Sequence, residues 1–164
     1  MKLKLPKKKV ITANASILRR ILAFLMDLLI INFIILRPFR NVLLKLMPGG
    51  SFNEAYSYLL SNQNSNAVLF FITLMISLLT MLYFVILQYK LNQTVGMMLF
   101  NLYLEPKEIK FWQALVRNLF IIPIFPFFLL WVLDPVHILF NKEGQRFTEK
   151  LSNTKVVQVY EVVR

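Results

Sequence analysis

Residues 67–89 read AVLFFITLMISLLTMLYFVILQY, a run of 23 residues without a charged side chain. A helix needs roughly 20 apolar residues to cross the hydrocarbon core of a bilayer. The run therefore predicts a transmembrane helix. Tyr83, Tyr89 and Lys90 give its end the amphipathic side chains that are typical of a membrane interface.

A second apolar run precedes it. Residues 21–36 are too short to span a bilayer alone, but counting from Ile17 restores the length if the flanking arginines extend toward the headgroups. We predict a first span over about 17–37, with Asn14 or Ser16 capping its start.

The third apolar run, 118–140, contains Pro123, Pro126 and Pro135. Proline removes a backbone donor and kinks or breaks a helix, and such breaks are tolerated at membrane depth only under protein or water cover. A kinked third span is the simpler interpretation. A broken, re-entrant segment is the alternative.

These runs predict an all-α, polytopic membrane protein with three apolar segments. We expect a basic segment at 1–16, a transmembrane domain at 17–158 and a short tail at 159–164. Short helices lying in the interface are expected over 52–60 and 109–117.

The composition agrees with this class. Apolar residues make up 57% of the chain and mean hydropathy is +0.59, yet 19 Lys and Arg oppose 8 Asp and Glu. Such apolar content excludes a disordered basic tail, and runs of membrane length argue against a soluble nucleic-acid-binding domain. With no cysteine and a single histidine, His137, we expect no disulfide, metal site or cofactor. We find no nucleophile–base pair and no phosphate-binding loop in the sequence, so we do not expect an enzyme.

The basic residues bear on topology. With the N-terminus inside, three crossings place 11 and 8 Lys and Arg on the two sides, whereas a re-entrant third run gives 16 and 3. The positive-inside rule thus favours the re-entrant alternative. Both arrangements predict a cytoplasmic N-terminus in the plasma membrane, with the lysines near the start close to anionic lipid headgroups.

Asp27 lies within the first predicted span, where a carboxylate is energetically unfavourable in the membrane. Such a residue usually faces a partner or marks a functional site. Arg20 lies on nearly the same helix face but two turns away, too far for a comfortable direct bridge. We expect a partner on another helix, with Arg117 the best candidate and Asn118 or Gln88 weaker ones. A helix–helix clamp and a ligand or proton site are equally plausible roles.

Asp134 and His137 share a helix face if the helix continues, which would suit a proton relay. The alternative, which we favour, is a helix that starts at the Asp134–Pro135 pair and a solvated histidine.

Four patterns together resemble the RDD family of small prokaryotic membrane proteins, which is named for one arginine and two aspartates. The family's Arg-x-x-Ala-x-x-x-Asp matches Arg20, Ala23 and Asp27, and a basic-plus-Asn start to the third run matches Arg117 and Asn118. Its Gly-Gln-Thr-x-Gly-Lys resembles residues 92–97, which include Thr94 and Gly96, and its Gly-Leu-Arg-Val resembles 101–104. Its His-Asp-x-x-Ala-Gly-Thr-x-Val-Val resembles 148–157, which include Glu149 and Thr154. The resemblance covers about residues 16–158.

This chain departs from the family at several of those positions. Met97 replaces the lysine, Glu149 the aspartate, and Asn92 and Asn153 replace glycines. If residues 102–104 pair with 155–157 as two short strands, both lie on one side of the membrane, which again favours a re-entrant third run.

The resemblance implies a membrane protein with a role in transport of an unidentified ligand or in cation/proton exchange. The first hypothesis is accordingly a small transporter or transport accessory that uses Asp27, framed by Arg20, Arg117 and Glu149, with Asp134 a further ion-binding candidate. Three apolar segments are too few to enclose a transport pathway, so we expect a homo-oligomer. The alternative is a lipid-binding or membrane-assembly protein with a basic cytoplasmic face.

Overall fold

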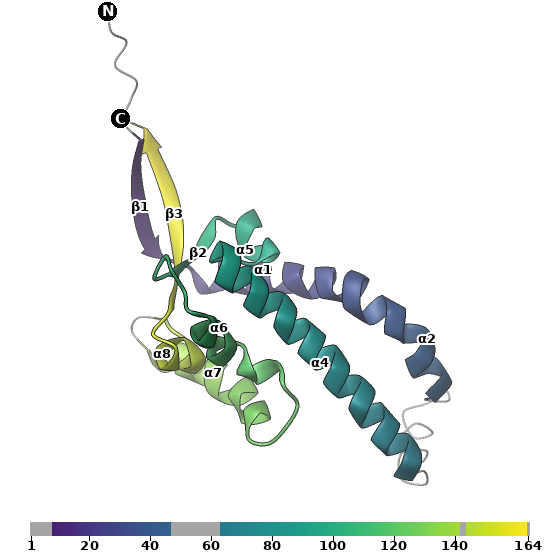
Figure 1. The fold of residues 1–164 in the computed structure, drawn as a ribbon. Helices are drawn as coiled ribbons and strands as arrows, with labels where there is room; N and C mark the ends of the chain where they lie inside the picture. The colour runs from purple at the N-terminus through teal and green to yellow at the C-terminus, as the bar shows by residue number, and fades with distance from the viewer. Residues whose placement is uncertain (1–7, 47–62, 142–143, 164) are drawn as a thin grey trace, which may run out of the picture.

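The computed structural model describes residues 8–46, 63–141 and 144–163, and two long helices and a small sheet organise them (Figure 1). The helices are α1 (Ile17–Ile31), α2 (Arg37–Leu46), α4 (Gln63–Leu91), α5 (Val95–Leu99), α6 (Phe111–Arg117), α7 (Leu130–Phe140) and α8 (Phe147–Leu151). The strands are β1 (Lys8–Asn14), β2 (Leu102–Glu105) and β3 (Lys155–Val163). The described residues also form a π-helical turn (Asn32–Leu36) and two 3-10 turns (Leu119–Ile121 and Phe127–Leu129).

Both predicted spans are helices of sufficient length. The π-helical turn joins α1 to α2, and the stretches Ile17–Asn41 and Ala67–Leu91, 25 residues each, are apolar enough to cross a membrane. Only 17% of each apolar window is buried inside the protein, which argues against the core helix of a soluble domain. Figure 1 shows both helices extending away from the sheet. Ser16 caps α1 as expected, its hydroxyl accepting a hydrogen bond from the Arg19 backbone at 3.5 Å.

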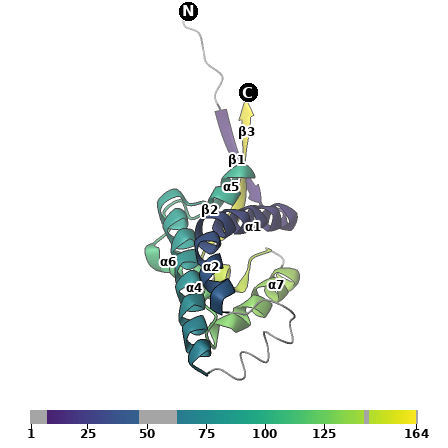
Figure 2. The same cartoon turned by 90° about the vertical axis from the view of Figure 1, so that its right-hand side faces the viewer.

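The described residues are mostly helical, as predicted, but the all-α prediction omitted a small sheet, in which β1, β3 and β2 pair antiparallel in that order. The valine-rich segment at the end of the chain favours a strand, and β3 extends through the expected tail as far as Val163. The pairing of 102–104 with 155–157 is confirmed, with Tyr103 opposite Val157 and Leu104 opposite Val156. The sheet therefore brings three segments together: the one before α1, the one after α5 and the one after α8 (Figures 1 and 2).

A third span over 118–140 is not confirmed. The run divides into two 3-10 turns and α7, whose 11 residues are short of a bilayer crossing. Pro123 and Pro126 lie in the breaks between these pieces, where no backbone donor is available to continue a helix. The indole of Trp131 donates to the Phe120 carbonyl at 2.6 Å, which holds the two halves of the run together.

The buried apolar core is small and lies where the helices meet the sheet. It comprises Ala15, Ala23, Val85, Met97, Leu102, Leu104, Ile109, Ala114 and Val156. The interfacial helix predicted at 109–117 corresponds to α6, on which Trp112 is exposed. The helix predicted at 52–60 and the first seven residues of the basic segment lie outside the described residues.

Candidate functional site

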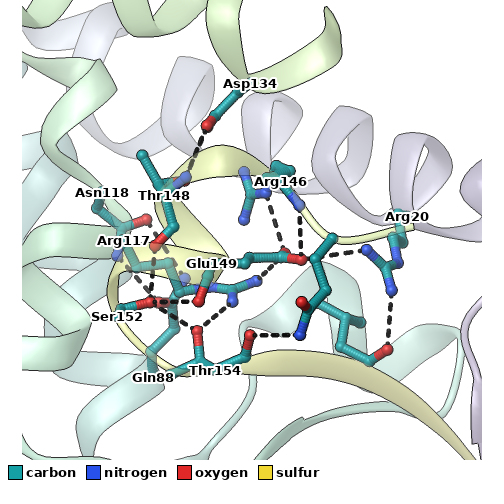
Figure 3. A network of polar contacts seen from close by, with 12 residues as sticks. Arg20, Gln88, Arg117, Asn118, Asp134, Arg146, Thr148, Glu149, Ser152 and Thr154 are labelled. Carbon is teal, nitrogen blue, oxygen red and sulfur yellow. Dashed lines mark hydrogen bonds and ion pairs between the residues drawn. The ribbon is translucent and has the colours of Figure 1, made fainter. Parts of the chain in front are cut away.

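Three arginines from different elements converge on one buried carboxylate (Figure 3). Oε1 of Glu149 accepts from Nη2 of Arg117 at 2.8 Å and from Nε of Arg146 at 3.0 Å, and Oε2 accepts from Nη1 of Arg20 at 3.2 Å. Glu149 is completely buried in α8, whereas Arg20 comes from α1 and Arg117 from the end of α6. We call Arg20, Arg117, Arg146 and Glu149 the arginine cluster. Its formal charge is +2.

Further hydrogen bonds fix the cluster to the sheet. Arg20 donates to the carbonyl oxygens of Gly144 at 2.7 Å and Val156 at 2.9 Å, and Arg117 donates to the Thr154 hydroxyl at 3.0 Å. The Nε atoms of Arg20 and Arg117 are nevertheless buried without a hydrogen-bond partner. Unpaired buried donors are uncommon and costly, so the positive charge of the cluster is not fully compensated within the described residues.

Electrostatics keeps the cluster ionised. Burial would raise the pKa of Glu149, but the charges of Arg117, Arg146 and Arg20 outweigh it and lower that pKa from 4.5 to about 2. Burial also lowers the pKa of Arg117 from 12.5 to about 10, while the Glu149 charge opposes the change. Both groups of this pair are therefore charged at neutral pH.

Asp27 does not belong to this cluster, and the prediction that Arg117 is its partner is wrong. Its Oδ1 accepts from the Tyr83 hydroxyl at 2.9 Å and from the Gly96 backbone N–H at 2.8 Å, and its Oδ2 accepts from the Thr94 hydroxyl. All three donors are neutral, and within the described ranges Asp27 forms no ion pair. Two donors come from the first turn of α5, so Asp27 holds the start of that helix against α1.

Gly96 and Ala23 make this contact possible because both are small. A Cβ on Gly96 would clash with the Ala23 carbonyl oxygen and would come within 2.9 Å of Cγ of Asp27. Both the Arg-x-x-Ala-x-x-x-Asp pattern and the Thr-x-Gly pattern thus belong to one interface between α1 and α5.

Asp134 plays a similar part at α8. Its two oxygens accept from the backbone N–H and the hydroxyl of Thr148, at 2.9 and 2.8 Å. The helix that carries Asp134 starts at Leu130, so the expected start at Asp134–Pro135 is wrong. His137 and Asp134 contact different groups, since Nδ1 of His137 contacts the Gln145 carbonyl oxygen at 2.9 Å. Each of the two aspartates therefore binds the first turn of a five-residue helix.

The two weaker partners proposed for Asp27 bind each other instead. Nδ2 of Asn118 donates to Oε1 of Gln88 at 2.9 Å, which joins α4 to the residue after α6. This pair lies beside the arginine cluster in Figure 3.

A cavity of about 330 Å³ is lined by the arginine cluster, by Asp27 and Asp134, and by the Gln88–Asn118 pair. Its polar lining includes Arg20, Asp27, Gln88, Thr94, Arg117, Asn118, Asp134, Arg146 and Glu149. The larger part of its wall is apolar and comes from α1 and α7 together with Phe84 and Phe120. Among the described residues, no group of three or more His, Cys, Asp or Glu could hold a metal ion.

Sequence reasoning missed Arg146, Tyr83 and Thr148 as members of these sites. The spacing of Arg146 and Glu149, three residues apart at a helix start, was the available signal for the first. Tyr83 was assigned to the membrane interface because its position opposite Asp27 depends on how α1 and α4 pack.

The two apolar helices, the small sheet and the polar groups between them define a mostly helical domain of the membrane-protein class, with a cavity beside the polar groups. The family model of the RDD family matches residues 14–153, so the chain belongs to the RDD family. No curated protein and no solved structure matches the chain.

The family patterns explain three unusual backbone positions. Asn92, Asn101 and Asn153 stand where the patterns quoted above have glycine, and their φ angles are 55°, 53° and 50°. Asparagine is among the few residues with a side chain that enter this left-handed region readily. At these three positions the chain therefore adopts a left-handed backbone, which glycine also enters readily.

Proposed function

We propose that this RDD-family protein is a small transporter, or an accessory of one, whose ligand occupies the cavity beside Asp27. The observation that carries the proposal is that one cavity is lined by both the Asp27 carboxylate, in a proposed span, and the arginine cluster. Intramembrane ionisable groups commonly mark substrate or proton pathways, and both kinds of charge meet at this cavity.

Asp27 is the proposed exchange site for a proton or cation. It is 2% exposed, and its carboxylate is held by neutral donors rather than by an arginine or lysine of the described residues. A carboxylate without a fixed counter-charge retains a net negative charge that a proton or cation can neutralise. The same hydrogen bonds also clamp α5 to α1, so the test must separate chemistry from structure.

The test is ion flux in vesicles containing the purified protein, with proton and monovalent-cation gradients compared. Asp27→Asn removes the charge and is expected to abolish flux, whereas Tyr83→Phe keeps the carboxylate and is expected to leave measurable flux. Glu108→Gln, at an exposed position, is the control for loss of a negative charge. Equal flux in wild type and Asp27→Asn, or none from wild type, would exclude this function.

We further propose that the N-terminus is cytoplasmic in the cell membrane and that the third apolar run re-enters rather than crosses. The common sheet of β1, β2 and β3 supports an even number of crossings, since a sheet forms on one side of the membrane. The distribution of 16 basic residues against 3 supports the same orientation. Two spans enclose no pathway by themselves, so transport would require a homo-oligomer, which cross-linking in the native membrane would detect.

The alternative function, lipid binding or membrane assembly through the basic N-terminal segment, predicts that deleting residues 1–10 abolishes salt-sensitive binding to anionic vesicles. An unchanged cellular phenotype after that deletion would count against it.

A further inference from the structure

The mouth of the cavity is the feature that identifies its ligand. Ile21 and Leu25 of α1 and Trp131 of α7 line the cavity, yet they are 51%, 50% and 67% exposed. Side chains that line the cavity and are also exposed at the protein surface mark where the cavity opens. The opening therefore lies on the apolar outer surface of a proposed membrane span and of the broken segment beside it.

The inner end of the cavity has the opposite character. Arg20 and Arg146 line it and keep 12% and 23% of their side chains exposed, while Arg117 lies beneath them almost fully buried. Among the described residues, Glu149 is the one carboxylate that forms ion pairs with these three arginines, and Asp27 and Asp134 are held by hydroxyl and amide donors. Guanidinium groups bind phosphate and carboxylate oxygens with well-matched geometry.

A free anion from water would not need an apolar mouth, and an uncharged lipid would not need a cationic inner end. The cavity volume of about 330 Å³ suits a small polar headgroup but not whole acyl chains, which would have to leave through the mouth. Ile21 and Leu25 lie within the first three turns of α1, at the end of the proposed span that is near the sheet.

We propose that the cavity binds an amphiphile with a phosphate or carboxylate headgroup, which enters from the bilayer. The headgroup lies against Arg20 and Arg146, and the acyl chains pass between Ile21 and Trp131 to the apolar surface. This names the ligand class for the cavity of the proposed function. It requires the helices to lie in a bilayer but does not require transport.

Binding is measured without flux, so this proposal and the transport proposal can fail separately. The full-length protein in detergent micelles is mixed with dioleoylphosphatidic acid or dioleoylphosphatidylcholine, and bound lipid is counted by mass spectrometry of the intact protein. We expect one tightly retained phosphatidic acid per chain and no comparable retention of phosphatidylcholine. Equal retention of the two lipids would overturn the proposal.

Two pairs of variants locate the binding. Arg146→Gln removes a cluster charge and is expected to weaken binding about tenfold or more, whereas Arg19→Gln removes an exposed charge that does not line the cavity and is expected to leave binding unchanged. Ile21→Trp is expected to fill the mouth and weaken binding, whereas Leu18→Trp, exposed on the same helix and outside the cavity lining, is not. Both substitutions to tryptophan are at exposed positions, and melting temperatures verify that every variant is folded.

Other outcomes decide against the proposal. If Arg19→Gln weakens binding as much as Arg146→Gln, the lipid is held by general surface charge. If millimolar inorganic phosphate displaces the lipid and binds equally well by itself, the site takes a free anion and not an amphiphile. If Ile21→Trp and Leu18→Trp behave alike, the lipid does not enter through the mouth.

Discussion

The Glu149 side chain forms ion pairs with all three arginines of the cluster. Without it, three guanidinium groups would be left in a largely buried space, with no other ion-pair partner among the residues that the structure describes. Removing one partner of a buried ion pair costs more than the pair contributes, since the remaining charge stays desolvated. Glu149 stands where the family pattern has aspartate, and its longer side chain still reaches all three arginines.

Glu149 makes stability dependent on acid pH. Its pKa is lower in the folded protein, about 2, than the ordinary 4.5, so the unfolded chain binds the proton more tightly. The stabilisation is complete above about pH 4.5 and is lost as the pH falls toward 2, about 3 kcal/mol in all at 1.36 kcal/mol per unit. Thermal melts of the detergent-solubilised protein between pH 2 and 6 should show this loss.

Glu149→Gln provides the control. It should destabilise the protein at neutral pH by about 3–5 kcal/mol and flatten the acid limb of the melting curve. Glu108→Gln, at an exposed site, should leave that limb unchanged. An acid limb that persists in Glu149→Gln would assign the effect to other carboxyl groups.

Gly96 is the second residue whose identity is fixed by geometry. Gly96→Ala should cost about 1–3 kcal/mol, because the new methyl group clashes with the Ala23 carbonyl and pushes α5 away from Asp27. Leu99→Ala, at an exposed position of the same helix, should change stability by less than about 0.5 kcal/mol. Chemical or thermal unfolding in detergent measures both, and similar values for the two variants would contradict the close contact.

Among elements, the short helices α5 and α8 are the least able to form alone. Each has five residues, well below the length at which an isolated helix is stable. Each begins where a longer helix supplies a carboxylate, Asp27 to α5 and Asp134 to α8. The same physical solution, an acidic acceptor at an unsatisfied helix start, is thus used twice.

The connection from α8 to β3 depends on Asn153. Because its φ is 50°, Asn153→Gly should be neutral or slightly stabilising, whereas Asn153→Ala should cost about 1 kcal/mol. Melting temperatures of the two variants, compared with wild type, measure the difference. A lower stability for glycine than for alanine would show that the Asn153 side chain matters more than its backbone.

At the scale of the whole molecule, the sheet determines which segments share a side. β3 lies between β1 and β2, so the beginning of the described chain, its middle and its end are hydrogen-bonded together. Two helices extend from this sheet, and the proline-broken run between β2 and β3 returns to it (Figure 1).

This arrangement predicts the labelling of single cysteines, which the cysteine-free chain allows without background. Leu5→Cys and Tyr160→Cys should react with a membrane-impermeant maleimide from the same side. Ser51→Cys, between the two spans, should react from the opposite side. If the cysteine at residue 160 were labelled from the same side as residue 51, and not from the side of residue 5, the third run would cross the membrane.

The sequence by itself predicted the two spans, a cap at Asn14 or Ser16, a third run kinked or broken by prolines, and the family, because length, charge and proline content act locally. It also predicted the pairing of 102–104 with 155–157, through the family's two strand-like pieces. Only the tertiary structure decided the partners of the charged residues. Asp27 accepts from Tyr83 and Gly96, not from Arg117, since polar pairing depends on which elements pack side by side. The cavity and its apolar mouth arise from the same tertiary arrangement, in which α1 and α7 both line the cavity beside the arginine cluster.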